Sequence, residues 1–352
     1  MGLKNIPLYQ RGIKGDSPKP FVPTIYIEYF LFRAILEGMK GKDLLSVADL
    51  GGEDIRLLIS DAISMKAQGW LNMLSGKSLA IMFEKPSLRT RVSFELAMRQ
   101  LGGEAIYLSP AEVGLGGRES VPDVAKVLSR YVDAITARTF SHQTLEVLAD
   151  YSAVPVINAL SDWEHPCQAL ADLLTISEKK GELQGLTLAF VGDGNNVARS
   201  LMLAASLTGM NFRIASPADY AIDQETLSLA QSNAAGSGGG ILCTDQPQLA
   251  VEGADVVYTD VWTSMGQEDE AKKRRQAFAG YQVDSQLLSL AKANAIFMHP
   301  LPAHHGEEVA EGILDTPQSV VFDQAENRLH IQKALLAAIL GGLEIPLAGY
   351  YR

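Results

Sequence analysis

Short apolar runs alternate with amphipathic stretches through most of this 352-residue chain. From Ser78 onward the runs SLAIMF, EAIYL, DAITAR and VPVINAL are separated by segments of helical pattern, such as the one from Thr90 to Leu101. Strands that alternate with helices pair in parallel through βαβ units rather than as hairpins. The sequence therefore predicts an α/β fold.

A second series of the same kind follows the polar segment EKKGELQG. It consists of LTLAFVG, NFRIAS, GGILC, DVVYTD and AIFMHP, with helical stretches between them, one over about 196 to 208. At roughly 150 residues per domain, the chain is long enough for two domains. We expect two doubly wound parallel-sheet domains linked by interdomain helices, with residues 41–183 forming the first domain and 184–323 the second.

Both ends of the chain lie outside these two series. Residues 1–40 lack the apolar core and cleavage site of a signal peptide, so we treat them as an N-terminal extension. Met39 stands directly before the well-patterned segment KGKDLLSVADL and is an alternative natural start. Residues 324–352 begin with a helix, to about Leu340, that is apolar on most faces. We expect this helix to be buried and to pack back on the first domain.

Composition excludes several classes of protein. Thirty Lys and Arg against 41 Asp and Glu give a net charge of −11, which disfavours nucleic acid as a partner. No run of about 18 apolar residues predicts a membrane span. The two cysteines cannot form a disulfide framework, and we expect a cytoplasmic protein. The pair His304 and His305 has no acidic or cysteine partner at a metal-ligand spacing, so we expect no metal.

The segment FEKPSLRTR, residues 83–91, follows the first predicted strand and opens a helix. The backbone N–H groups of Ser87 to Thr90 would then be free at a helix N-terminus, where an anion is stabilised. Three basic residues against one acid give this segment a local charge of about +2 in an acidic protein. The segment predicts an anion site, although an ordinary capped helix with solvated arginines has the same pattern.

Polar side chains follow two further strands of the first series. Arg138 ends the strand DAITAR, and His165 and Gln168 lie three residues apart in EHPCQALAD, on one edge of a helix. Ligands of open parallel sheets bind beyond the carboxyl ends of the strands, where these segments converge. The combination favours a site for a phosphate and a carbonyl group, although a lone histidine is more often structural.

The second series offers other polar groups at strand ends. VGDGNNVARS lacks the third glycine of a dinucleotide-binding turn, but Asn195 and Asn196 offer amides to a substrate carboxylate or cap the next helix. Asp260 ends the strand DVVYTD and precedes a long charged loop to about Gly280. Loops of this length are often lids. In MHPLPAHH, two prolines would hold the turn after the last strand rigid.

Six segments, SLRTR, HPCQALAD, GDGNN, DVWTSMG, HPLPA and AENRLH, resemble the ornithine carbamoyltransferase family, in order across about residues 40–345. SxRTR and HPxQ are shared with the aspartate branch, whereas the SMG loop resembles the ornithine branch. The resemblance implies transfer of the carbamoyl group of carbamoyl phosphate to the δ-amino group of L-ornithine, giving L-citrulline and phosphate in arginine metabolism. It implies no cofactor, and a homotrimer or a multiple of it.

The resemblance also implies roles for individual residues. Those implied to bind carbamoyl phosphate are Ser87, Leu88, Arg89, Thr90, Arg138, His165, Gln168 and Arg328, of which Arg89, Arg138 and His165 are implied to be catalytic. Those implied to bind ornithine are Asn196, Asp260, Ser264, Met265, Pro300 and Leu301. For Arg328, a salt bridge between the domains is the alternative.

The chain departs from the family pattern at three positions. Leu88 replaces a threonine of the phosphate motif, Gly114 replaces a His or Gln that reaches into a neighbouring subunit, and Pro300 replaces a cysteine often assigned to the ornithine side chain. Two alternatives follow: a carbamoyltransferase for another amine such as putrescine, or a non-catalytic protein that binds carbamoyl phosphate or an amino acid. The intact arginines, His165 and Gln168 argue against lost catalysis.

Overall fold

The computed structural model describes residues 38–115, 117–264, 266 and 268–341. Its first sheet contains four parallel strands in the order β2-β1-β3-β4, with bounds β1 Ser78–Phe83, β2 Glu104–Leu108, β3 Ala134–Arg138 and β4 Val156–Leu160. Strands β1 and β3 lie in the middle of the sheet and are buried along almost their whole length. This burial explains why both sequences are continuous apolar runs rather than alternating ones.

The second sheet contains five parallel strands in the order β7-β6-β5-β8-β9. The bounds are β5 Thr187–Val191, β6 Asn211–Ala215, β7 Gly240–Thr244, β8 Val256–Thr259 and β9 Ile296–Met298. In both sheets the strand order reverses beside the strand that comes first in the chain. The crevice at such a reversal, beyond the carboxyl ends of the strands, is where open α/β sheets bind ligands.

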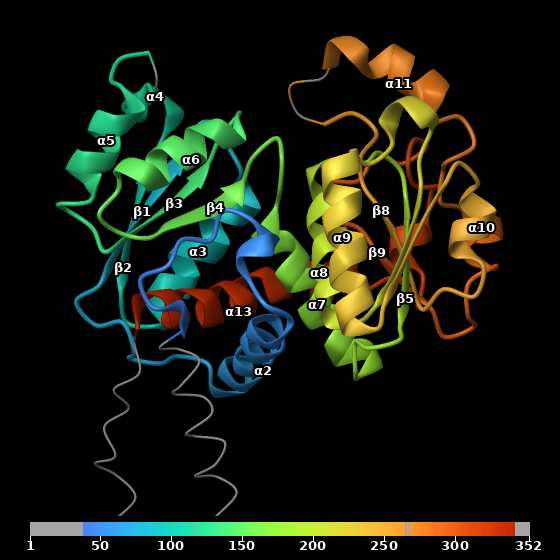
Figure 1. Cartoon of the computed structure of the whole chain (residues 1–352), viewed down its shortest axis with the longest axis horizontal. Helices are drawn as coiled ribbons and strands as arrows, with labels where there is room; N and C mark the ends of the chain where they lie inside the picture. Colours follow the sequence, from blue (N-terminus) through green and yellow to red (C-terminus); the bar gives the residue numbers. More distant parts are fainter. Residues whose placement is uncertain (1–37, 116, 265, 267, 342–352) are drawn as a thin grey trace, which may run out of the picture.

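Helices cover both sheets and fill the space between them (Figure 1). The helices are α2 Gly52–Gln68, α3 Leu88–Gln100, α4 Pro110–Val113, α5 Val121–Leu128, α6 His142–Tyr151, α7 Pro166–Lys180, α8 Asn196–Thr208, α9 Gln224–Ser237, α10 Pro247–Val251, α11 Ala271–Ala277, α12 Ser285–Leu288 and α13 Val321–Leu340. Short 3-10 turns occur at η1 Val47–Asp49, η2 Ala218–Tyr220, η3 Glu268–Glu270 and η4 Ile313–Asp315. Helices α7 and α8 lie between the two sheets and pack against each other.

The last helix, α13, returns from the second sheet to the first half of the molecule. It packs against α2, α3 and α7, and all its residues from Asn327 to Leu340 except Leu329 are buried. One continuous apolar cluster contains Phe94 of α3, Phe190 of β5 and Leu335 of α13. The two halves therefore share a core, and burial of α13 holds its polar residues in fixed positions between them.

The predicted α/β fold with two parallel sheets is confirmed. The structure differs from the sequence prediction in the segment between Asp260 and Gly280, where a long loop was expected. Part of that segment forms η3 and α11, stabilised by an ion pair of 3.2 Å between Arg274 and Glu270 at the (i, i+4) spacing. Among the described residues, no helix combines the length and the apolar run that crossing a membrane requires. The predicted extension 1–40 lies almost entirely outside the described residues.

Candidate active site

The N-terminus of α3 opens toward the space between the two sheets. Ser87 caps the helix, because its Oγ accepts the N–H of Thr90 at 3.4 Å and donates to Thr90 Oγ1 at 3.0 Å. The N–H groups of Leu88 and Arg89 are not used by this cap, and both residues line the cleft. Leu88 is 77% exposed, so its side chain does not fill the anion position that the backbone offers.

Three guanidinium groups converge behind this helix start. Arg89 comes from α3, Arg138 from the end of β3 and Arg328 from α13, and all three line the cleft. Burial, together with the positive charges of Arg328 and Arg89, lowers the pKa of Arg138 to about 10. Burial likewise lowers the pKa of Arg328 to about 10. All three groups remain charged at pH 7, so their mutual repulsion favours a bound anion.

The hydrogen bonds of these guanidinium groups leave donors facing the cleft. Arg328 donates from Nη2 to Thr90 Oγ1 at 2.6 Å, and Arg89 donates from Nη2 to the Leu301 carbonyl at 2.8 Å. The Nε atoms of Arg138 and Arg328 are buried and donate to no partner within the described part of the chain. Thr90 is fully buried and is not among the residues that line the cleft, but its Oγ1 accepts hydrogen bonds from Arg328 and Ser87.

His165 and Gln168 complete this end of the cleft. The His165 N–H donates to Ser200 Oγ at 2.9 Å, which fixes the start of α7 against α8. Burial lowers the pKa of His165 well below its ordinary value, and the charges of Arg328 and Arg138 act in the same direction. The imidazole is therefore neutral at pH 7, and its buried Nδ1 has no partner among the described residues. A neutral imidazole here can donate to, or accept from, a substrate.

The opposite wall of the cleft carries a fixed carboxylate. Asp260, at the end of β8, is 7% exposed. Asn195 donates to its Oδ2 at 2.8 Å and the N–H of Val261 donates to Oδ1 at 2.8 Å. Burial raises the pKa of Asp260, and the hydrogen bond from Asn195 opposes this rise. Asn196 also lines the cleft, but its side-chain amide donates to the Ser161 carbonyl at 2.7 Å.

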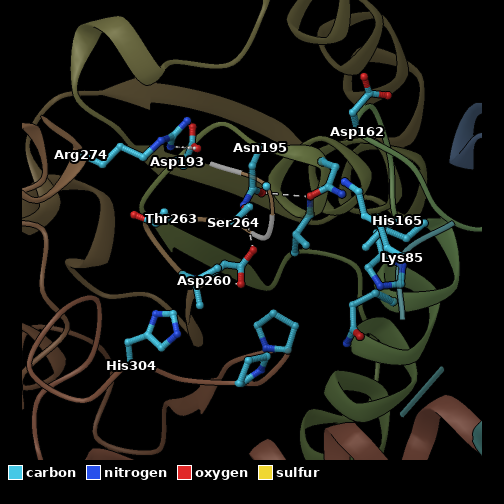
Figure 2. Close-up of a pocket in the computed structure, with 18 of the residues that line it drawn as sticks. Lys85, Asp162, His165, Asp193, Asn195, Asp260, Thr263, Ser264, Arg274 and His304 are labelled. Carbon is cyan, nitrogen blue, oxygen red and sulfur yellow. Dashed lines mark hydrogen bonds and ion pairs between the residues drawn. The ribbon is translucent and has the colours of Figure 1, made fainter. Parts of the chain in front are cut away.

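The segment after Asp260 includes α11, whose Arg274 connects it to the loop after β5. Arg274 of α11 forms a buried ion pair of 2.6 Å with Asp193 and donates to the Trp262 carbonyl at 3.0 Å. Figure 2 shows this pair beside Asn195, with Ser264 facing the same space as Asp260. Met265, the other predicted residue of this loop, lies outside the described residues.

The turn after β9 reaches the cleft through Pro300 and Leu301. The Leu301 N–H donates to His299 Nδ1 at 2.9 Å, so His299 Nε2 carries the proton that faces Glu308 Oε1 at 3.2 Å. His299 and Glu308 are fully buried and support the turn from behind. The Leu301 carbonyl, predicted to face the second substrate, accepts from Arg89, which leaves one of its lone pairs open.

The expectation that no acidic side chain accompanies His304 is wrong. His304, Glu307 and Glu308 place ligand atoms within 4.8 Å of one another, because residues 304 and 308 are separated by four positions in the turn. Two of these groups are engaged elsewhere, since Glu307 pairs with Arg275 at 2.8 Å and Glu308 Oε1 accepts from His299. The group is therefore explained by contacts within the protein.

All these residues surround one cleft of about 1610 Å³ between the two sheets. Figure 2 shows His165 and Lys85 on one side and Asp260, Ser264 and His304 on the other. Every predicted site residue within the described ranges lines it, except Thr90. The cleft has room for two small substrates, an anion at α3 and an amine near Asp260.

Sequence reasoning overlooked several groups of the site. Asn195, rather than Asn196, contacts Asp260, and Arg274 pairs with Asp193 across 81 positions of sequence. Asp193 stands between two glycines at the end of β5, which is a signal that could have singled it out. Arg274 lies in the charged segment that the sequence predicted only as a long loop of the kind that often forms a lid.

Comparison with known proteins agrees with this geometry. Residues 42–178 match the family model described as aspartate/ornithine carbamoyltransferase, carbamoyl-P binding domain, and residues 184–339 match its Asp/Orn binding domain. The chain is 50% identical to an ornithine carbamoyltransferase of Thermococcus kodakarensis over 311 residues, which cover 87% of this chain and 99% of the relative. It is 54% identical to the Bacillus subtilis ornithine carbamoyltransferase over 300 residues, which cover 85% and 94%.

The fold is similar to that of a solved structure with the same name. The ornithine carbamoyltransferase of Pyrococcus furiosus superposes with a TM-score of 0.84 at 51% identity, covering 87% of this chain and 99% of that one.

Replacing Arg89 by methionine should weaken the binding of inorganic phosphate by about tenfold or more, because a hydrogen bond to a charged group contributes about 1.5–3 kcal/mol. Arg91→Met is the matched control, since Arg91 lies on the same helix but pairs with Glu95 at 2.8 Å outside the cleft. Isothermal titration calorimetry measures both affinities. Equal phosphate affinity of the two variants would remove Arg89 from the anion site.

Proposed function

Because this chain belongs to the aspartate/ornithine carbamoyltransferase family, we propose that the cleft transfers the carbamoyl group of carbamoyl phosphate to the δ-amino group of L-ornithine, giving L-citrulline and phosphate. The observation that carries this proposal is the division of the cleft. Three guanidinium groups, His165 and Gln168 lie at one end, and a fixed carboxylate, Asp260, lies at the other.

We assign carbamoyl phosphate to the end of the cleft at α3. Its phosphate would accept from the N–H groups of Leu88 and Arg89 and from the guanidinium groups of Arg89, Arg138 and Arg328. Its carbonyl oxygen would face Arg138 and His165. When the amine attacks, negative charge develops on that oxygen, and donors that are already fixed stabilise the charge without reorganising.

The amine must lose its proton before it attacks. An alkyl ammonium with a pKa of about 10.4, as in lysine, costs roughly 4–5 kcal/mol to deprotonate at pH 7. Positive charges of the arginine cluster and removal of water both favour the neutral amine. The nitrogen forms a bond to the carbamoyl carbon while the bond from that carbon to the phosphate oxygen breaks, and the departing phosphate takes the surplus proton.

We assign the α-ammonium group of ornithine to Asp260, and its α-carboxylate to the loop that contains Ser264 and Met265. Asn196 lines the same cleft, and we assign its amide to the α-carboxylate once it leaves the Ser161 carbonyl. Pro300 has neither a thiol nor an N–H group, so it cannot contact the ornithine side chain in the way assigned to the cysteine at this position. The open lone pair of the Leu301 carbonyl is the acceptor that we assign to the δ-amine.

The proposal also assigns roles to parts of the chain. Residues 41–183 would bind carbamoyl phosphate, residues 184–323 would bind ornithine, and residues 324–352 would supply Arg328 from the helix that packs back on the first part. The direction of the reaction in the cell, toward arginine synthesis or breakdown, uses the same site in both cases. A relative from Pyrococcus furiosus, 51% identical, carries the description anabolic, and we propose the synthetic direction for this chain.

Citrulline formation with L-ornithine should exceed carbamoylation of L-aspartate, putrescine or N-acetyl-L-ornithine by about 100-fold or more, because only ornithine pairs every polar group of the cleft. The four amines are supplied at equal concentration with carbamoyl phosphate, and the carbamoylated products are quantified. A preference for putrescine would support the alternative that this enzyme carbamoylates an amine other than ornithine. Binding of carbamoyl phosphate without any turnover would favour a non-catalytic protein.

Asp260→Asn should raise the KM for ornithine by about tenfold or more and leave the affinity for carbamoyl phosphate unchanged, because it removes only the charge that faces the α-ammonium group. Asp219→Asn is the matched control, since Asp219 lines the same cleft at an exposed position. Steady-state kinetics with each substrate varied separately measures both effects. An unchanged KM for ornithine would exclude Asp260 from the ornithine site.

We further propose a cytoplasmic homotrimer, or a multiple of it. Both cysteines are free thiols, and exposed apolar side chains lie on two elements that pack together, Val92 on α3 and Ile106 on the edge strand β2. Native mass spectrometry should give three 38.0-kDa chains or a multiple of three. A stable monomer or dimer with full activity would contradict this assembly.

A further inference from the structure

We propose that Asp172 is a positioning residue that fixes the orientation of the Gln168 side-chain amide, so that its carbonyl oxygen faces the carbamoyl group. The inference rests on the proposed function and adds a residue that does not touch substrate. Asp172 is fully buried on α7, between the cleft and α13, and it is not a lining residue. Nothing in the transfer reaction itself uses its carboxylate.

The hydrogen bonds around Asp172 allow only one orientation of the neighbouring amide. Gln168 Nε2 donates to Asp172 Oδ1 at 2.8 Å, one helical turn away on α7. A carboxylate accepts hydrogen bonds and cannot donate them, so a flipped Gln168 would place one oxygen against another. The amide NH₂ is therefore held toward Asp172. Gln168 Oε1 is left toward the cleft, buried and without a hydrogen-bond partner in the described ranges.

This orientation matches the chemistry of one substrate atom. The carbamoyl nitrogen of carbamoyl phosphate carries two N–H donors and needs acceptors, whereas the surrounding arginines offer only donors. Gln168 Oε1 is an acceptor that this end of the cleft supplies. If the amide flipped, its NH₂ would face the carbamoyl NH₂, and two donors would be left unpaired in a buried site.

A second amide is held by the same carboxylate. Gln324 of α13 donates from Nε2 to Asp172 Oδ1 at 2.7 Å, while its Oε1 accepts the N–H of His299 at 2.9 Å. Tyr258 donates to the other oxygen, Oδ2, at 3.0 Å. Asp172 therefore connects Gln168 to the turn that carries Pro300 and Leu301, across the boundary between the two sheets.

The network holds its geometry in either protonation state of Asp172. Burial raises the pKa of Asp172, and the hydrogen bonds from Gln168, Gln324 and Tyr258 lower it. Burial has the larger effect, so the pKa is raised to about 7. A proton on Oδ2 would face Tyr258 and leave Oδ1 free to accept from both amides. The acceptor at Oδ1, rather than the negative charge, is what orients Gln168.

Three substitutions of Asp172 should differ in how well they hold the Gln168 amide. Asp172→Leu has a similar shape but no acceptor, so the Gln168 amide becomes free to flip. Asp172→Asn keeps an acceptor at Oδ1 and can donate to Tyr258 from the other atom. Asp172→Val is the second test should the leucine variant not fold, because valine is smaller than leucine and also offers no acceptor.

Three stable probes separate the amide contact from the anion contact. Phosphonoacetamide carries the NH₂ group, phosphonoacetate replaces it with a carboxylate oxygen, and inorganic phosphate has neither. The readout is the ratio of the dissociation constants of phosphonoacetate and phosphonoacetamide, measured by titration calorimetry. Thr175→Val is the matched control, since Thr175 is equally buried on α7 and contacts Asn327 instead of Gln168. Circular dichroism verifies that each variant is folded.

We expect Asp172→Leu and Asp172→Val to lower the ratio by about tenfold, a difference of about 1.4 kcal/mol, with phosphate affinity nearly unchanged. Asp172→Asn and Thr175→Val should keep the wild-type ratio. A wild-type ratio in the leucine or valine variant would overturn the inference. A ratio in the asparagine variant as low as in those two variants would also overturn it. Failure of the wild-type protein to bind phosphonoacetamide would instead contradict the proposed function.

Discussion

Repulsion among three neighbouring guanidinium groups is the constraint on which the site depends. Arg138 of β3 and Arg328 of α13 are buried, and Arg89 of α3 is half-buried. The charges of Arg328 and Arg89 lower the pKa of Arg138, and the charge of Arg89 lowers that of Arg328. No carboxylate forms an ion pair with any of them within the described ranges. The cluster therefore favours a bound anion, and it lies at the N-terminus of a helix, which favours one as well.

The architecture supplies what this cluster requires. Parallel strands bring the end of β3 and the start of α3 to one edge of the first sheet, and the second sheet presents Asp260 across the cleft. Burial of α13 between the halves brings Arg328 to the cleft and Gln324 to the hydrogen bonds behind it. Arg89 reaches the Leu301 carbonyl, so the two walls are already connected before any substrate binds. Stability and function thus depend on the same buried helix.

The sequence was sufficient for the fold because continuous apolar runs and helical patterns determine buried parallel strands. It was also sufficient to predict that Ser87 and Arg138 lie close together, because the carboxyl ends of parallel strands meet at one edge of a sheet. It could not decide between Asn195 and Asn196, since adjacent residues at a helix start point in different directions. Nor could it identify the role of Asp172. In the sequence Asp172 is one polar position of an amphipathic helix, and its contact with Gln324 exists only because α13 packs against α7.

The most direct test is a crystal structure of the complex with a bisubstrate analogue in which a phosphonoacetyl group is joined to the δ-nitrogen of L-ornithine. The account predicts the phosphonate at the N–H groups of Leu88 and Arg89, within hydrogen-bond distance of the three guanidinium groups, and the α-ammonium group at Asp260. A phosphonate bound away from α3, or an analogue whose amino-acid end lies away from Asp260, would contradict the division of the cleft into an anion end and an amine end.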